Sequence, residues 1–152
     1  MTDFASTLKD ERDVCDALYR FAEGIDLRDW PLYRSAFADR ITVDYTSYRA
    51  GSQGEMAADD WVARAQARFA TLDATQHTMT NPRVSLMGDR ALCSMYVEAH
   101  HVVVQAGGAT ECTLGGRYLN EVVRLDGRWG ISTLNLQVRW IRGDRSILDL
   151  PT

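Results

Sequence analysis

Residues 111–141, with the sequence ECTLGGRYLNEVVRLDGRWGISTLNLQVRWI, decide the fold. Two stretches, 111–125 and 128–141, are rich in β-branched and aromatic residues and flank the dipeptide Asp126-Gly127. An Asp-Gly pair between such stretches is typical of a two-residue β-hairpin turn, because both turn positions need a positive φ. The sequence therefore predicts two long antiparallel strands joined at Asp126-Gly127.

Two further long strands precede this hairpin, at residues 76–86 and 90–105. The turns that separate the strands contain Gly88-Asp89 and Gly107-Gly108. A shorter strand is predicted at 41–48, where β-branched residues alternate with polar ones, and a loop follows at 51–54. The second half of the chain is therefore predicted to be an antiparallel meander.

The first half is predicted to be mainly helical. The first helix is expected to begin at a cap on Ser6 or Thr7 and to end near Gly24. Its apolar face is formed by Val14, Leu18, Phe21 and Ile25. A short helix then runs from its cap at Asp29 to about residue 37, with Pro31 in the first turn. A third helix covers 58–72.

Helices followed by a meander define an α+β fold, with the N-terminal helices packed on one face of a strongly curved, mainly antiparallel sheet. Such a sheet closed by helices forms a cone-shaped α+β barrel, and its mouth is a natural ligand pocket. With 152 residues the chain fits a single domain over residues 1–152.

Composition excludes several classes of protein. The formal net charge of −4 argues against a nucleic-acid partner, which usually meets a basic face. No apolar run approaches the roughly 20 residues of a membrane span, and the N-terminal residues lack the apolar core of a signal peptide. The three cysteines form no CxxC pair and are expected to be reduced thiols. We therefore expect a cytoplasmic protein without a membrane partner.

Histidines are the first candidates for acid–base chemistry, because their pKa lies near neutral pH. His77 falls early in the first long strand, and His100 and His101 are adjacent on the second. Adjacent strand residues point to opposite faces, so only one of this pair can enter the cone. Asp26 follows the apolar Ile25 just past the predicted end of the first helix. It is either a loop carboxylate or the partner that orients a histidine ring.

The remaining polar candidates are weaker when taken alone. Tyr45, Tyr48 and Tyr118 are possible hydrogen-bond donors, although most tyrosines in a small domain serve packing. A metal site of two histidines with Asp26 or Glu98 is conceivable, but the chain has no HxH, HxxxH or HExxH spacing. It also lacks GxSxG and the phosphate-binding loops. We expect neither a metal nor a cofactor.

Several stretches together resemble the SnoaL-like, scytalone dehydratase-like family of the nuclear-transport-factor-2-like superfamily. The resemblance covers about residues 8–145. It is most specific in the turn DLRDW and in the tripeptide TQH. The matching stretches are 20–37 (RFAEGIDLRDWPLYRSAF), 43–48 (VDYTSY), 75–77 (TQH), 114–121 (LGGRYLNE), 126–129 (DGRW) and 138–140 (VRW).

This resemblance implies an Asp–His pair inside the cone, with His77 removing a proton from carbon while Asp26 orients it. It further implies that Tyr45 polarises the substrate and that His100, rather than His101, is a second pocket histidine. Tyr118 is added as a further phenol in the pocket. The implied substrate-binding residues are Ile25, Tyr48, Gly116, Arg139 and Trp140. Ile25, Gly116 and Tyr118 stand where scytalone dehydratase has a tyrosine, a serine and an asparagine, so a different, largely apolar substrate is expected.

The resemblance implies a cofactor-independent lyase that performs a dehydratase-type β-elimination on a small cyclic, polyketide-like or steroid-like molecule. An isomerase or cyclase with the same base is the alternative, and so is a non-catalytic ligand-binding or dioxygenase small-subunit-like assembly protein. We also expect a homo-oligomer, with a trimer favoured and a dimer as the alternative. Val103, Leu119 and Val123 would lie on the convex face of the sheet and need cover.

Overall fold

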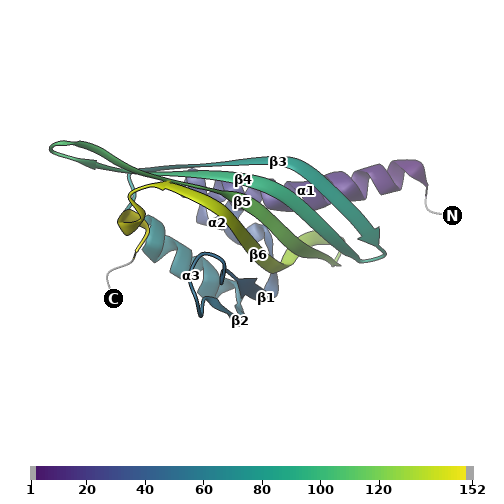
Figure 1. Cartoon of the computed structure of the whole chain (residues 1–152). Coiled ribbons are helices and arrows are strands. Elements are labelled where there is room, and N and C mark those ends of the chain that lie inside the picture. Colours follow the sequence, from purple (N-terminus) through teal and green to yellow (C-terminus); the bar gives the residue numbers. More distant parts are fainter. Residues whose placement is uncertain (1–2, 150–152) are drawn as a thin grey trace.

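Two helices come first, two short strands and a third helix follow, and the four long strands form the second half of the chain (Figure 1). The computed structural model describes residues 3–149, and this part of the chain forms three α-helices, six strands and one short 3-10 helix. The elements are α1 (Phe4–Asp26), α2 (Trp30–Ser35), β1 (Phe37–Asp44), β2 (Gln53–Ala57), α3 (Ala58–Phe69), β3 (Ala74–Met87), β4 (Arg90–Gln105), β5 (Gly108–Leu125), β6 (Arg128–Gly143) and η1 (Arg145–Leu148).

The strands form one mixed sheet in the order β2-β1-β6-β5-β4-β3. Neighbouring strands are antiparallel except β1 and β6, which run parallel. The sheet is open and strongly bent, and the helices pack on one side of it (Figure 1). The predicted α+β cone architecture is thereby confirmed.

The predicted hairpin between β5 and β6 is present. Leu125 pairs with Arg128, and the two turn residues Asp126 and Gly127 have φ values of 52° and 77°. Both positive angles are those that a two-residue turn of this kind requires. The short helix α2 is also confirmed, with the side chain of Asp29 accepting a hydrogen bond from the backbone N–H of Leu32 at 2.9 Å.

Element ends differ from the predictions in three places that affect the site. The strand predicted at 41–48 is found earlier, as β1 (Phe37–Asp44), so Tyr45 and Tyr48 lie in the segment that follows it. Helix α1 does not end near Gly24 but continues to Asp26, so Asp26 is a helical residue and not a loop carboxylate. Gly24 instead allows α2 to approach, because a Cβ at this position would lie 2.5 Å from the backbone nitrogen of Tyr33. Strand β2 covers part of the predicted loop at 51–54. It is an edge strand whose polar residues give no apolar alternation.

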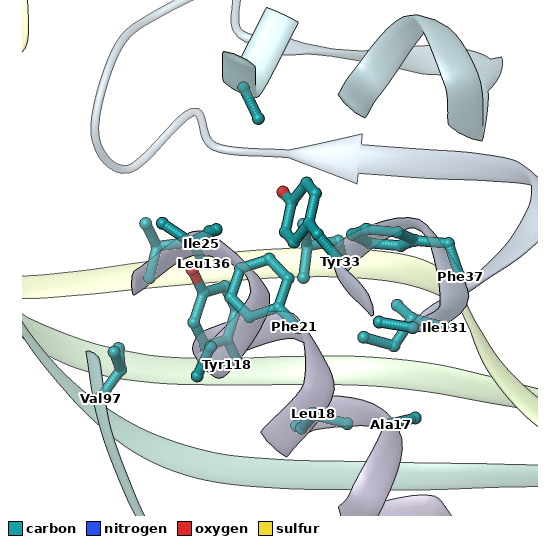
Figure 2. Packing of buried hydrophobic residues seen from close by; sticks show 14 of the residues in the cluster. Ala17, Leu18, Phe21, Ile25, Tyr33, Phe37, Val97, Tyr118, Ile131 and Leu136 are labelled. Carbon is teal, nitrogen blue, oxygen red and sulfur yellow. The ribbon is translucent and has the colours of Figure 1, made fainter. Parts of the chain in front are cut away.

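The core fills the space between α1, α2 and the concave face of the sheet. Phe21 of α1 is central to it (Figure 2), and its ring centroid lies 5.4 Å from that of Tyr118 and 5.5 Å from that of Tyr33. Cys15, Cys93 and Cys112 are free, as predicted. No helix within residues 3–149 is both long and apolar enough to span a membrane.

Candidate functional site

A cavity of about 270 Å³ lies between the helices and the concave face of the sheet. Most of its wall is aromatic or aliphatic, and the polar groups of its residues are phenols, one indole, two imidazoles and two guanidinium groups. The lining residues are Phe21, Ile25, Tyr33, Tyr45, Tyr48, Trp61, Arg64, Ala65, Arg68, Phe69, His77, Val97, Ala99, His101, Leu114, Tyr118, Leu136 and Leu148. An apolar cavity with a few polar groups is the usual form of a small-molecule site.

His77 and Asp26 form a hydrogen-bonded pair at the wall of this cavity. The Nδ1 of His77 lies 2.7 Å from Oδ1 of Asp26, and the backbone N–H of His77 donates to Oδ2 at 2.7 Å. The pair forms because the last residue of α1 meets the start of β3, 51 residues later in the sequence. Two bonds from one residue to both carboxylate oxygens hold the imidazole in a single orientation.

The protonation of this pair follows from its partners. Burial alone would raise the pKa of Asp26, but the hydrogen bonds and charge of His77, together with the Thr75 hydroxyl, bring the pKa below its ordinary value. The carboxylate is therefore ionised and accepts the Nδ1–H of the ring. The neutral imidazole then carries its lone pair on Nε2, the atom that can take a proton in a base-catalysed reaction.

Thr75 and Arg28 complete the network, and neither was predicted from the sequence. The Thr75 hydroxyl donates to Asp26 at 3.0 Å and accepts from the Arg28 guanidinium at 2.8 Å. Arg28 has a φ of 57°, and its guanidinium also donates to the carbonyl oxygens of Ile25 and Leu72. These contacts tie the end of α1 to the start of β3. The tripeptide TQH, which contains Thr75, was a usable signal in the sequence. The direction of the Thr75 side chain could not be predicted from it.

The prediction for the adjacent histidines is wrong. His101 lines the cavity and is only 6% exposed, whereas His100 lies on the opposite face, where Thr113 and Glu98 contact its ring nitrogens at 3.1 and 2.9 Å. Strand register explains the result. His77 pairs with Ala99 across β3 and β4, so Ala99 and the residue two positions later share its face.

His101 is neutral and already bonded. Burial, followed by the nearby charge of His77, lowers the pKa of His101 to about 4. Its Nδ1 lies 3.1 Å from the carbonyl oxygen of Cys112, which can only accept, so Nδ1 carries the proton. The ring of His101 therefore offers the cavity a lone pair on Nε2 and no proton. The rings of His77 and His101 meet edge to face, with centroids 5.8 Å apart.

Tyr45 and Tyr118 lie in the cavity wall, with their hydroxyl oxygens 3.1 Å apart. Burial raises the pKa of Tyr118 to about 12 and the pKa of Tyr45 well above its ordinary value. Both phenols are therefore protonated. Since one hydroxyl donates to the other, the pair has one O–H left for a ligand.

Of the other predicted binding residues, Ile25 and Tyr48 line the cavity, and three do not. Gly116 is not part of the wall, and a Cβ there would lie 2.2 Å from the carbonyl oxygen of Gln137, so the residue allows β5 and β6 to approach. Arg139 and Trp140 are exposed. Between Gly115 and Gly116 the pairing with β6 shifts by one residue, which places the Trp140 indole over Gly115, outside the cavity.

Metal-binding side chains do not cluster in the described part of the chain. No group of three or more His, Cys, Asp and Glu residues within 3–149 has the arrangement of a metal site.

Fold and site together define a cone-shaped α+β domain whose apolar cavity contains an Asp-oriented histidine. Comparison with protein families agrees with this description, because residues 6–135 match the SnoaL-like domain. The chain belongs to the SnoaL-like domain family.

Individual relatives are more distant. A scytalone dehydratase from Colletotrichum orbiculare is 23% identical over 146 residues, which cover 91% of this chain and 78% of that protein. The crystal structure of the Kfla4162 protein from Kribbella flavida is 26% identical, with a TM-score of 0.84 and coverage of 90% of this chain and 95% of the other. A hexachlorocyclohexane dehydrochlorinase from Novosphingobium barchaimii is 20% identical, with a TM-score of 0.72 and coverage of 96% and 97%.

Proposed function

We propose that the protein is a cofactor-independent lyase that eliminates a small molecule, most simply water, from a largely apolar cyclic substrate, with His77 as the general base. The observation that carries the proposal is the 2.7 Å contact between Nδ1 of His77 and the Asp26 carboxylate at the wall of an apolar cavity. The names of two relatives, a dehydratase and a dehydrochlorinase, describe eliminations and support the same class of reaction.

In the proposed reaction, Nε2 of His77 takes a proton from an acidic C–H bond of the substrate. The electron pair of that bond forms a carbon–carbon double bond, and the hydroxyl on the neighbouring carbon leaves with its own bonding pair. The leaving hydroxyl takes a proton from the imidazolium formed at His77, so water departs and the base is regenerated. Asp26 stabilises the transient imidazolium by its negative charge.

The remaining cavity groups stabilise charge and exclude water. The free O–H of the Tyr45–Tyr118 pair is placed to donate to a substrate oxygen that gains negative charge when the proton leaves carbon. His101 replaces His100 as the second pocket histidine and acts as an acceptor, because its neutral ring presents a lone pair.

An isomerase or cyclase would share the first step, since the same base removes the same proton. The two outcomes differ in mass: elimination of water lowers the mass of the product, whereas isomerisation leaves it unchanged.

A panel of small cyclic β-hydroxy ketones, analysed by mass spectrometry, tests the proposal. We expect at least one to lose water in the presence of the wild-type protein, and His77→Gln to slow this reaction about 10²- to 10⁴-fold. The matched control is His100→Gln, because His100 lies on the opposite face of the same sheet. Unchanged turnover by His77→Gln would reject the mechanism, and products of unchanged mass would assign the isomerase alternative.

A homo-oligomer, favoured as a trimer, remains part of the proposal. The outer face of the sheet exposes Leu92 and Tyr96 of β4 and Trp140 of β6, at 50%, 58% and 45%. Val103, which was predicted to lie on this face, packs against the core instead. Light scattering should give about three times 17.1 kDa, and Tyr96→Glu should lower this mass. A wild-type mass of one chain would reject the oligomer.

A further inference from the structure

The cavity continues away from His77 into a second hollow of about 190 Å³. This hollow reaches the segment between β1 and β2, where Arg49 and Ser52 lie on its wall. The residues common to the two hollows are Tyr45, Tyr48, Trp61, Arg64 and Arg68. Arg64 and Arg68 stand one turn apart on α3, so both guanidinium groups are on one face of the helix at the junction of the hollows.

The junction is positively charged in a protein whose formal net charge is −4. None of the residues that line either hollow is an Asp or a Glu. Arg34, Arg40 and Arg124 form ion pairs with carboxylates elsewhere, but within residues 3–149 neither Arg64 nor Arg68 does so. Asp60, one turn before Arg64, makes no ion pair with it either. Two like charges one turn apart repel each other unless an anion lies between them.

Tyr48 adds a buried polar group without a partner. The side chain is only 6% exposed. Two guanidinium groups contact its ring, with Cζ of Arg68 at 5.2 Å and Cζ of Arg145 at 4.5 Å from the ring centroid. Its hydroxyl makes no hydrogen bond within the described residues. Buried polar groups without a partner are rare in folded proteins, so an unpaired hydroxyl on a residue of the cavity wall points to a ligand that accepts from it.

We propose that Arg64, Arg68 and the Tyr48 hydroxyl bind an anionic oxygen group of the substrate, a carboxylate or a phosphate ester. The inference deepens the proposed function, on which it rests, because it names the substrate class of the same cavity: an apolar skeleton with an acidic group at the end away from His77. Guanidinium groups suit this task, since their planar N–H donors match the oxygens of carboxylates and phosphates.

The arrangement separates binding from chemistry. Arg68 donates to the carbonyl oxygen of Leu148 at 3.1 Å and stacks on Tyr48, so its guanidinium is held at the cavity wall. An anionic group fixed there would anchor one end of the substrate and orient the reacting carbon toward Nε2 of His77. Binding energy from a group remote from the reaction is a common source of such positioning.

Three naphthalene probes of similar shape test the proposal by calorimetry on the full-length protein: 2-naphthoate, 2-naphthyl phosphate and the neutral 2-naphthamide. We expect one of the two anions to bind more tightly than the amide, by about tenfold or more. The tighter anion identifies the group as carboxylate or phosphate. Equal binding of the amide, or no measurable binding of any probe, would overturn the proposal.

Substitutions in the cavity wall test which residues produce the preference for the anion. Arg64→Gln and Arg68→Gln should each reduce the preference for the anion several-fold, Arg68→Lys should keep part of it, and Tyr48→Phe should weaken anion binding without affecting the amide. The matched control is Arg12→Gln, which removes an exposed arginine of α1 that lines neither hollow. A preference that survives the double variant Arg64→Gln/Arg68→Gln, in protein with a wild-type melting curve, would place the anion elsewhere and reject the site.

Failure of this inference is distinguishable from failure of the proposed function. His77→Gln should leave the preference for the anion unchanged, because His77 is not part of the anion site. An intact anion preference without any elimination activity would therefore reject the lyase alone.

Discussion

The two ends of the cavity differ in how their polar groups are satisfied. At the His77 end, Asp26 accepts three hydrogen bonds from His77 and Thr75, and Arg28 donates to Thr75 in turn. At the arginine end, the Tyr48 hydroxyl has no partner and Arg64 makes no ion pair among the described residues. The first end is organised before any ligand arrives, which is what a proton transfer requires. The second end is incomplete without a ligand, which is what selective binding requires.

The largest effect on turnover is expected from Asp26→Asn, which disrupts only the His77 end of the cavity. The amide has one oxygen to accept with, so the His77 ring loses its fixed orientation and the charge that stabilises its protonated form. We expect turnover to fall about 10²-fold or more, while the anion preference at the arginine end stays as in the wild type. Steady-state kinetics measures the turnover of this variant, and calorimetry measures its preference for the anion.

Asp16→Asn is the control for this experiment, because Asp16 lies on the same helix in an exposed ion pair with Arg20. Its turnover should equal that of the wild type. If Asp26→Asn matched Asp16→Asn in turnover, Asp26 would have no role in the reaction.

The next effect concerns the pH dependence of stability at the organised end. The pKa of His101 is about 4 in the folded protein, below its ordinary value of 6.5, so the unfolded chain binds the proton first as the pH falls. This contribution to stability is complete above pH 6.5 and is lost as the pH falls toward 4, by about 3 kcal/mol in all. Asp26 stabilises the folded protein throughout this range, and its contribution is lost only below about pH 3.8, because its pKa is lowered from 3.8.

Urea unfolding of the wild type and of His101→Gln at several pH values between 4 and 7 measures this effect. The free energy of unfolding should fall less steeply with decreasing pH in the variant. Parallel curves would show that His101 is not held neutral by burial, and the cavity wall beside His77 would then be more polar than described.

The smallest effect is expected from glycine substitutions that change the packing behind each end of the cavity. Gly24 stands two residues before Asp26, and Gly54 lies on β2 near the second hollow. A Cβ at Gly24 would meet the Tyr33 backbone at 2.5 Å, whereas a Cβ at Gly54 would meet nothing within 4 Å. We expect Gly24→Ala to lower the free energy of unfolding by about 1–3 kcal/mol, and Gly54→Ala to change it by about 0.5 kcal/mol or less. Equal effects of the two substitutions on thermal unfolding would show that the packing behind the two ends does not differ.

Local signals in the sequence predicted much of the fold. The Asp126-Gly127 turn and the strand at 90–105 follow from turn chemistry and side-chain periodicity, and both are found in the structure. Strand β2 escaped prediction because an edge strand of polar residues has no buried face to create a pattern. The continuation of α1 past Gly24 agrees with the apolar periodicity, which includes Ile25. Gly24 was taken as the end of the helix because its role, to allow the approach of α2, is not visible in the local sequence.

The site was less predictable, because it depends on register between distant strands. Periodicity shows that one of His100 and His101 enters the cavity, but the pairing of His77 with Ala99 decides which one. A one-residue shift between β5 and β6 likewise turns Trp140 away from the cavity. The Asp26–His77 contact was expected only from the family resemblance, since nothing in either local sequence requires it.

The most direct test of the account is the tautomer of His77, which nitrogen-15 NMR of the histidine rings measures without a substrate. We predict that in the neutral ring Nδ1 carries the proton and Nε2 gives the signal of an unprotonated nitrogen, and that Asp26→Asn abolishes this preference. A proton on Nε2 of His77 in the wild-type protein would contradict it, because no lone pair would then be available to take a proton from carbon.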